Sequence, residues 1–470
     1  MDMFAGLPLS PTHSYENESE VREKIYDYLK NPDEYTCSIT MGYPRTAQKS
    51  YGNERRLLMC YPAVILSGQG WRHRVNEMRD LCQNVECTVH HPRPPLHPQY
   101  PGQAVLDKQT FVTAEMMTTN GEVWRIPDTI YADTPVMAQL RINDDRDEVS
   151  VKATQLKLRL FYNGCYDIGI FASKMINVLS KPQRSAASNS QKNLAFKSGD
   201  IITLSVRNTK LTRNLCVTNG QLGADLPYYS TFQIFLVDDE MTESDNIKVV
   251  DDEVITYGST VKLIDTETNI GLPKMRILRS DERGITLSSV PGVQEVLHFH
   301  RVAFQFFDEP NLFLGLDDMD FQNVRPKSAK QEPFVKSGQR MLDPSTSETW
   351  LLLPHESITY TFAELNGTVH GPVTPAPLFE NYMEFAKGEF VSVDGNSFTP
   401  RLQAWVDDIP LDTYYKNSES MVVRLPDEEE RRDSENRLRA VGLTPTLQLV
   451  FVRDDFIMYP TSYFFNDKEK

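Results

Sequence analysis

The chain of 470 residues is 40% hydrophobic and 24% charged, and its formal net charge is −16. This composition is typical of a soluble globular protein of about three domains, and it excludes a largely disordered chain and a membrane-spanning one. An acidic chain is also unlike a protein that coats nucleic acid indiscriminately, so any nucleic-acid site has to be small and local.

The predicted elements change from helix to strand soon after the N-terminus. Residues 1–19 are polar and contain prolines, which predicts a flexible tail. In the next segment, 20–30, Val21, Ile25 and Leu29 are spaced by four and predict a helix. Alternating apolar residues then predict short strands through most of the chain. Examples are 156–160, 168–172, 232–236, 302–306, 312–316 and 390–393.

Breaks in this pattern divide the chain. Residues 84–103 are crowded with proline and histidine and are expected to form a surface insertion. The Ser/Ala/Asn-rich stretch 180–192 predicts a first domain boundary. A second transition at 327–338 precedes a polar connection that leads to the Gly-Pro-Val-Thr-Pro segment at 371–375. The charge run 427–435 is interpreted as a solvated loop or helix.

One short segment is basic although the whole chain is acidic. Between Arg45 and Arg74 there are six Lys or Arg residues and one acid, Glu54. Within it, segment 47–56 combines these cations with hydroxyl and amide side chains, and Gly52 allows a sharp bend. Arginine can bind phosphate or the guanine edge, and Asn and Gln can read adenine. The pattern favours a local polyanion contact, with an ordinary solvated loop as the alternative.

Segment 47–56, Ala-Gln-Lys-Ser-Tyr-Gly-Asn-Glu-Arg-Arg, resembles the DNA-contacting loop of the CSL transcription factors, the Suppressor of Hairless and J-kappa recombination-signal-binding group. Further segments resemble the same family in the same order along the chain, and together they identify the chain as a divergent member. These segments are 161–164, 167–174, 180–182, 257–263, 371–375, 396–400 and 419–421.

The resemblance implies a mainly β architecture with two Rel-homology immunoglobulin-like sandwiches on either side of a central β-trefoil. The expected boundaries place the DNA-binding sandwich at 20–180 and the trefoil at 181–335. A connecting segment at 336–370 then leads to the C-terminal sandwich at 371–470.

The resemblance also implies three strips of DNA contact. In the first, Arg56 reads bases in the major groove while its neighbours position the loop. In the second, at 173–178, Met175 and Asn177 stand where the family has basic residues, which predicts a shallower salt dependence. The third is a trefoil hairpin at 205–213, directed at the minor groove and two residues shorter than usual. The predicted contacts are Gln48, Lys49, Ser50, Tyr51, Gly52, Asn53, Arg55 and Arg56, then Ser173 and Lys174, then Arg207, Asn208 and Arg213. A plain strand edge and a plain hairpin are the alternatives for the second and third strips.

The family also implies a peptide-docking pocket on the trefoil. The matching residues are Ile247, Val249, Lys262 and Gly271, with simple core packing as the alternative. By the same resemblance the protein acts as a monomer on double-stranded DNA with a GTGGGAA-like site. It would exchange corepressors for a Notch intracellular domain with a Mastermind-type coactivator. The alternatives are a DNA-bound regulator without Notch input, and an adaptor that has lost DNA binding.

The remaining motifs predict neither a metal site nor an enzyme. Cys82, Cys87, His90 and His91 are potential zinc ligands, but their spacing fits no common zinc finger. Signatures for phosphate-binding loops and for catalytic serine or zinc are absent from the sequence, and no cofactor is expected. His298 and His300, in a predicted strand, are interpreted as structural.

The cysteines and the first residues predict the compartment. Six cysteines lack the regular spacing of a disulfide framework, and the N-terminal residues lack the features of a secretory signal. Both features fit cytosol or nucleus, and the family resemblance favours the nucleus.

Overall fold

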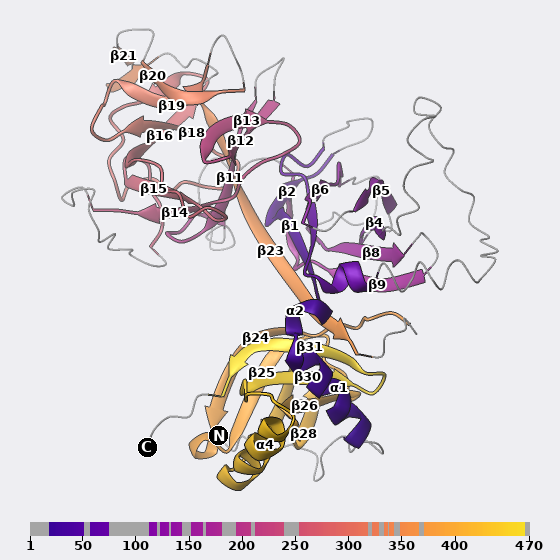
Figure 1. Ribbon diagram of the computed structural model, residues 1–470. Coiled ribbons are helices and arrows are strands. Elements are labelled where there is room, and N and C mark those ends of the chain that lie inside the picture. The colour runs from indigo at the N-terminus through magenta and orange to yellow at the C-terminus, as the bar shows by residue number, and fades with distance from the viewer. Residues whose placement is uncertain are drawn as a thin grey trace, which may run out of the picture.

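The computed structural model describes residues 18–50, 57–74, 112–119, 123–130, 133–142, 152–162, 166–180, 194–207, 212–238, 253–317, 322–328, 333–336, 338–342, 348–365 and 371–465. The protein is mainly β, as predicted, with a trefoil between two immunoglobulin-like parts (Figure 1). The predicted tail, the Pro/His-rich insertion and the four potential zinc ligands lie outside the described residues, apart from the last residues of the tail. Among the described residues, no helix is long and apolar enough to cross a membrane.

The N-terminal domain consists of small sheets, mostly antiparallel, that pack around a shared core. In one sheet β1 (Thr36–Pro44) pairs with β3 (Ala63–Ser67), which in turn pairs with β6 (Val136–Met137). A second sheet has the order β5-β4-β8-β9. Its strands are β4 (Val112–Thr118), β5 (Val123–Ile130), β8 (Leu156–Tyr162) and β9 (Tyr166–Ala172). The predicted alternation in β8 is confirmed, because Leu156, Leu158 and Leu160 are buried while Lys157 is exposed.

The central domain is a succession of antiparallel strands around its own core. Phe196, Phe232, Phe304 and Trp350 are fully buried there. Its strands are β11 (Ile201–Arg207), β12 (Thr212–Thr218), β13 (Gln221–Asp225), β14 (Phe232–Leu236), β15 (Thr260–Asp265), β16 (Met275–Asp281), β17 (Gly284–Thr286), β18 (Arg301–Phe306), β19 (Leu312–Leu316), β20 (Val324–Ser328), β21 (Phe334–Lys336) and β22 (Gln339–Leu342).

The C-terminal domain is a sandwich of two sheets. One has the order β24-β25-β29-β28 and the other joins β27, β26, β30 and β31. The bounds are β24 (Leu378–Phe385), the 3-10 helix η2 (Ala386–Gly388), β25 (Phe390–Asn396), β26 (Leu402–Val406), β27 (Ile409–Pro410), β28 (Thr413–Asn417), β29 (Ser420–Arg424), β30 (Gln448–Arg453) and β31 (Ile457–Phe464). The charge run is a helix, α4 (Glu428–Ala440), which begins with a capping box between Asp427 and Glu430.

A single strand of 15 residues, β23 (Trp350–Glu364), links the three domains. It pairs antiparallel with β1 from Thr36↔Ala363 to Pro44↔His355, with β11 at its start, and with β31 at its end. Figure 1 shows it, in orange, running from the central domain past β1 to the C-terminal domain. Much of the segment expected as a connection at 336–370 is therefore sheet, because its apolar residues are buried between domains.

The predicted N-terminal helix is present as α1 (Glu18–Lys30), followed by the short α2 (Pro32–Tyr35). The buried face of α1 contacts the C-terminal domain rather than the N-terminal one. Val21, Ile25 and Tyr28 share a cluster with Trp405 and Val452. The two ends of the described chain are therefore packed together.

Candidate nucleic-acid interface

A small sheet brings the first two predicted DNA strips side by side. β2 (Thr46–Gln48) pairs in parallel with β10 (Ile176–Leu179), and β10 pairs with β7 (Ala153–Thr154). In this register Ala47 lies opposite Val178 and Gln48 opposite Leu179. The Gln48 side-chain amide also donates to the Ser180 carbonyl at 3.3 Å. Segments far apart in sequence thus form one edge of the domain.

Both ends of the predicted reading loop are fixed by backbone hydrogen bonds. At the entry, the Lys49 N–H donates to Leu179 O at 3.0 Å and the Ser50 N–H to Ile142 O at 2.8 Å. At the exit, the Leu58 N–H donates to Leu140 O at 2.7 Å. Tyr51, Gly52, Asn53, Arg55 and Arg56 lie outside the described residues. The loop therefore begins and ends at rigid points on the same segment, Leu140–Ile142, which carried no signal in the sequence because it acts through its backbone.

Most described cations of the basic segment are engaged inside the protein. Lys49 is only 2% exposed. Arg45 forms two hydrogen bonds to the Asp200 carboxylate, at 3.0 and 3.1 Å. Arg74 is buried with its Nε 2.7 Å from Glu364. Among the described cations of 45–74, Arg72 remains exposed. Counting charges in the sequence overstated the basic surface, because acids from distant segments, the half-buried Asp200 and the buried Glu364, neutralise part of it.

The second strip offers little free positive charge. Ser173 is buried, and its hydroxyl accepts from the Leu156 N–H at 3.0 Å and donates to the Lys174 carbonyl at 2.7 Å. Lys174 is half exposed, and its Nζ lies 3.2 Å from a carboxylate oxygen of Glu380 in β24. Met175 and Asn177 are exposed at the positions expected to be basic. Phosphate would have to compete with Glu380 for Lys174.

The third strip is a hairpin, as predicted. β11 and β12 pair with Val206 opposite Arg213 and Arg207 opposite Thr212. The half-buried Arg213 donates to the Thr212 carbonyl at 3.0 Å. Arg207 is placed by its backbone at the end of β11, and Asn208 lies outside the described residues.

A buried histidine of the trefoil forms hydrogen bonds to the N-terminal domain. His298 Nδ1 lies 2.8 Å from Thr46 Oγ1, and Nε2 lies 3.2 Å from Arg45 Nη2. Arginine is only a donor, so Nε2 accepts and Nδ1 carries the proton that is donated to Thr46. Burial, with the nearby Arg45 and His300, lowers the pKa of His298 to about 3. The neutral ring agrees with the structural role inferred from sequence.

The histidines lie in a turn, however, where the sequence pattern predicted a strand. The Leu297 carbonyl accepts from the His300 N–H at 3.0 Å, and Phe299 has a positive φ of 64°. Neither a strand residue nor most bulky side chains adopt this conformation. The alternation of apolar and polar residues could not reveal it.

The described part of the predicted peptide pocket is compact. Ile264 in β15 forms an isolated bridge with Gly271, and a Cβ on Gly271 would lie 2.8 Å from Lys262 Cε. The aliphatic part of Lys262 thus covers the glycine, and Leu272 beside it is buried. Ile247 and Val249 lie outside the described residues. In the described part of the chain, no cluster of three metal-ligating residues occurs.

Three family models match successive parts of the chain. Residues 39–193 match "LAG1, DNA binding", residues 219–337 match "Beta-trefoil DNA-binding domain", and residues 377–467 match "TIG domain". With the sandwich–trefoil–sandwich fold, these matches define a multidomain β-protein that binds double-stranded DNA.

Similar proteins cover nearly the whole chain. The recombining binding protein suppressor of hairless-like protein of Mus musculus is 29% identical over 95% of this chain and 82% of its own length. The Homo sapiens protein of the same name is 28% identical over 98% and 84%. The chain belongs to the CSL family, whose members are DNA-binding transcription regulators and not enzymes.

Likeness to solved structures is weak. A complex of lysenin with phosphocholine has a TM-score of 0.18 and 11% identity, over 52% of this chain and 76% of that one.

Proposed function

We propose that the protein regulates transcription in the nucleus by binding, as a monomer, a GTGGGAA-like site in double-stranded DNA. The observation that carries this proposal is the loop between Ser50 and Leu58, whose two ends are hydrogen-bonded to Ile142 and Leu140. Fixed ends reduce the entropy lost when a loop is ordered on a ligand, and a rigid scaffold can present a loop with precision.

Within this loop, Arg56 reads a guanine in the major groove. Tyr51, Gly52, Asn53 and Arg55 adjust the loop on the backbone of the DNA. Lys49 and Ser50 do not reach the DNA in this proposal but anchor the first stem of the loop, because both are buried. Gln48, held on Ser180, lies at the margin of the contact.

The other strips add weaker contacts. Lys174 approaches a phosphate beside the loop, and Ser173 fixes the backbone that carries it. Arg207, Asn208 and Arg213 place the β11–β12 hairpin at the minor groove, where readout is degenerate. Because Met175 and Asn177 supply no charge, the decrease of log K with log salt should be shallow.

Replacing Arg56 by alanine tests base readout. We expect Arg56→Ala to weaken binding to the cognate duplex by about 1–3 kcal/mol and to leave a scrambled duplex nearly unaffected. Titrations of both duplexes at two salt concentrations measure this. The matched control is Arg72→Ala, an exposed cation outside the loop, which should change both affinities equally.

Two outcomes contradict parts of the proposal. Equal losses on both duplexes with Arg56→Ala would make Arg56 a phosphate contact. A wild-type protein that does not distinguish the duplexes at either salt concentration would be an adaptor without specific DNA binding.

We propose that the DNA-bound protein changes transcription by exchanging corepressors for a Notch-type intracellular segment and a Mastermind-type coactivator. The supporting observation is the covered glycine of the trefoil pocket, where Lys262 lies across Gly271. Ile247 and Val249 are proposed to supply apolar contacts to the docked segment. By the family resemblance, metazoan members bind an apolar motif of the Notch intracellular region at this pocket.

A peptide titration separates this reading from a DNA-bound regulator without Notch input. The DNA-bound protein should bind an apolar Trp-Pro peptide, and Val249→Asp should abolish peptide binding while DNA affinity is kept, because a buried charge costs more than the apolar contact it replaces. Failure of the wild-type complex to bind the peptide favours the regulator without Notch input.

A further inference from the structure

A turn of the trefoil is packed under the base of the reading loop. The residues around this joint are Pro44, Thr46, Ala47, Gln48, Leu57, Leu58, Met59, Cys60, Phe299 and Leu353. The space left between them is about 10 Å³, which is no more than one water molecule needs. The joint is therefore a packed contact and not a ligand cavity.

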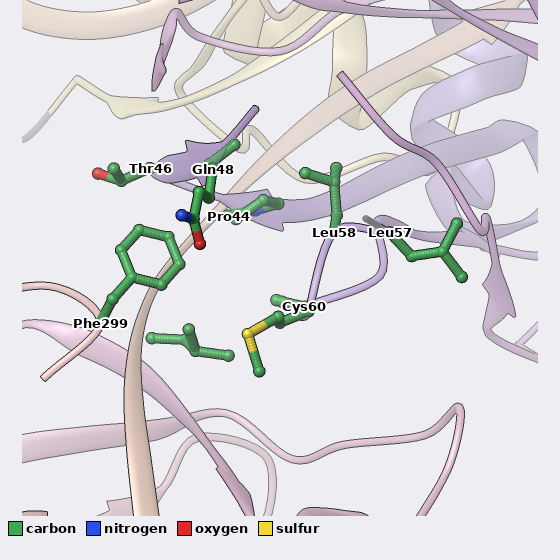
Figure 2. Close-up of a pocket in the computed structure, with 10 residues that line it drawn as sticks. Pro44, Thr46, Gln48, Leu57, Leu58, Cys60 and Phe299 are labelled. Atoms are coloured by element: carbon green, nitrogen blue, oxygen red, sulfur yellow. The ribbon is translucent and has the colours of Figure 1, made fainter. Parts of the chain in front are cut away.

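Phe299 lines this joint from the trefoil side. Figure 2 shows its ring directed from the trefoil at Gln48 and Thr46, with Leu58 and Cys60 from the other end of the loop nearby. Its side chain is 8% exposed, and it shares a buried cluster with Cys60 and Leu353. The ring thus faces the entry stem at Thr46 and Gln48 and belongs to the same buried cluster as Cys60 of the exit stem.

The backbone of Phe299 is held in an unfavourable conformation. Its φ of 64° lies in the left-handed region, which costs a bulky L-residue free energy. Two hydrogen bonds to β23 maintain it, from the Phe299 N–H to Leu352 O and from the Leu352 N–H to His300 O, both at 3.0 Å. Strain that the surroundings maintain is often found at functional sites.

Neighbouring contacts fix the same joint from both sides. His298 holds Thr46 and Arg45 at the entry stem. At the exit stem, the trefoil residue Tyr229 donates its hydroxyl to the Tyr61 carbonyl at 2.8 Å. The Phe299 side chain is the apolar contact between these two polar contacts.

From this geometry we infer that Phe299 is a positioning residue for base recognition. It touches no DNA, but its ring holds the two stems of the reading loop at the spacing that presents Arg56 to the groove. The trefoil thereby contributes to specificity through the neighbouring domain. This inference rests on the proposed function of the loop and adds to it a residue from another domain.

Phe299→Gly removes the ring without disturbing the backbone of the turn, because glycine adopts a positive φ without strain. We expect the full-length variant to remain folded by circular dichroism. Its ratio of affinities for cognate and scrambled duplexes should fall about tenfold, within the range of coupling between contacting residues. Phe299→Leu, which keeps apolar bulk, should restore most of this ratio.

The matched control is Phe313→Ala. Phe313 is fully buried in a separate trefoil cluster, with Leu278 and Ile285, so its loss destabilises the same domain without touching the loop stems. The control should leave the affinity ratio unchanged. Combining Phe299→Gly with Arg56→Ala should lower the ratio little beyond Arg56→Ala alone. An unchanged ratio in Phe299→Gly, or an equal fall in Phe313→Ala, overturns the inference.

Hydrogen exchange in the absence of DNA keeps the two proposals distinguishable. Amides in 48–58 should exchange faster in Phe299→Gly than in the wild type and in Phe313→Ala, because the stems lose their common support. If the wild type does not discriminate between duplexes, DNA reading fails while this exchange difference still supports the packing role of Phe299. If exchange is unchanged, the positioning role fails even where DNA reading holds.

Discussion

At the scale of single residues, Asp408 shows how the two ends of the chain are joined. Its carboxylate is fully buried at the turn before β27. It accepts from Tyr26 Oη of α1 at 2.7 Å, from Arg437 Nε of α4 at 2.7 Å and from Ser434 Oγ. Burial alone would raise the pKa of Asp408, but these hydrogen bonds outweigh it and the pKa is lowered.

Removing this charge should be costly. We expect Asp408→Asn to lower the free energy of unfolding by about 2–4 kcal/mol, because Arg437 loses a bidentate partner and Ser434 and Tyr26 lose an ionised acceptor. Chemical denaturation measures the change. The control Asp412→Asn weakens a pair with Arg424 that is only partly buried, and it should cost less than about 1 kcal/mol. Equal decreases in the free energy of unfolding for the two substitutions would show that the buried network is no more stabilising than the pair between Asp412 and Arg424.

The ion pairs of charged residues could not be predicted from the sequence. The segment from Arg45 to Arg74, predicted as a polyanion contact, carries the two stems of the loop, and its role in DNA contact stays a prediction. Its charge was overestimated because Asp200 and Glu364, which pair with Arg45 and Arg74, are more than 150 positions away in the chain. Pairing over such distances depends on tertiary structure and leaves no local pattern.

At the scale of elements, local periodicity was a good guide. The helix at 20–30 and the strand at 156–160 are present, because their apolar spacing matches the face that each element buries. The capping box at Asp427 decides between loop and helix for the charge run. The packing of α1 on the C-terminal domain could not be predicted from the sequence, since contacts such as Tyr26–Asp408 join residues 382 positions apart.

The strand β23 lies within 336–370, which the sequence pattern predicted to be a connecting segment. Ser345 and Ser347 precede this strand and Pro354 lies within it, which gives a polar and broken pattern that is typical of a connection. Yet Leu352 is buried in the trefoil core, Ile358 and Phe362 are buried beside β1 of the N-terminal domain, and Ala363 belongs to the cluster of α1 and the C-terminal sandwich. A strand that changes partner along its length buries different faces, so a single alternation does not describe it.

At the scale of the whole molecule, the three domains share structure instead of being linked by flexible segments. β23 pairs with strands of each domain, and α1 crosses to the C-terminal sandwich. The stems of the loop between Ser50 and Leu58 are therefore held by contacts from the trefoil as well as by their own domain.

Two buried histidines lie where the trefoil meets the N-terminal domain. His298 contacts Arg45 and Thr46. His355 in β23 packs against Gly42 and Tyr229, and burial lowers its pKa to about 4. Both pKa values lie below the ordinary 6.5, so the folded state keeps both rings neutral in a range where the unfolded chain is protonated.

The junction between these domains should therefore be sensitive to acid. Below pH 6.5 the unfolded state binds more protons than the folded state, so each histidine should cost about 1.4 kcal/mol of stability per pH unit as the pH falls toward 5. Above pH 6.5 the contribution of these histidines should be constant. Denaturation at pH 7.5, 6 and 5 measures the slope, and the double substitution His298→Gln with His355→Gln should flatten it, since glutamine takes up no proton. A slope that is the same with and without the two histidines would assign the acid sensitivity to other groups.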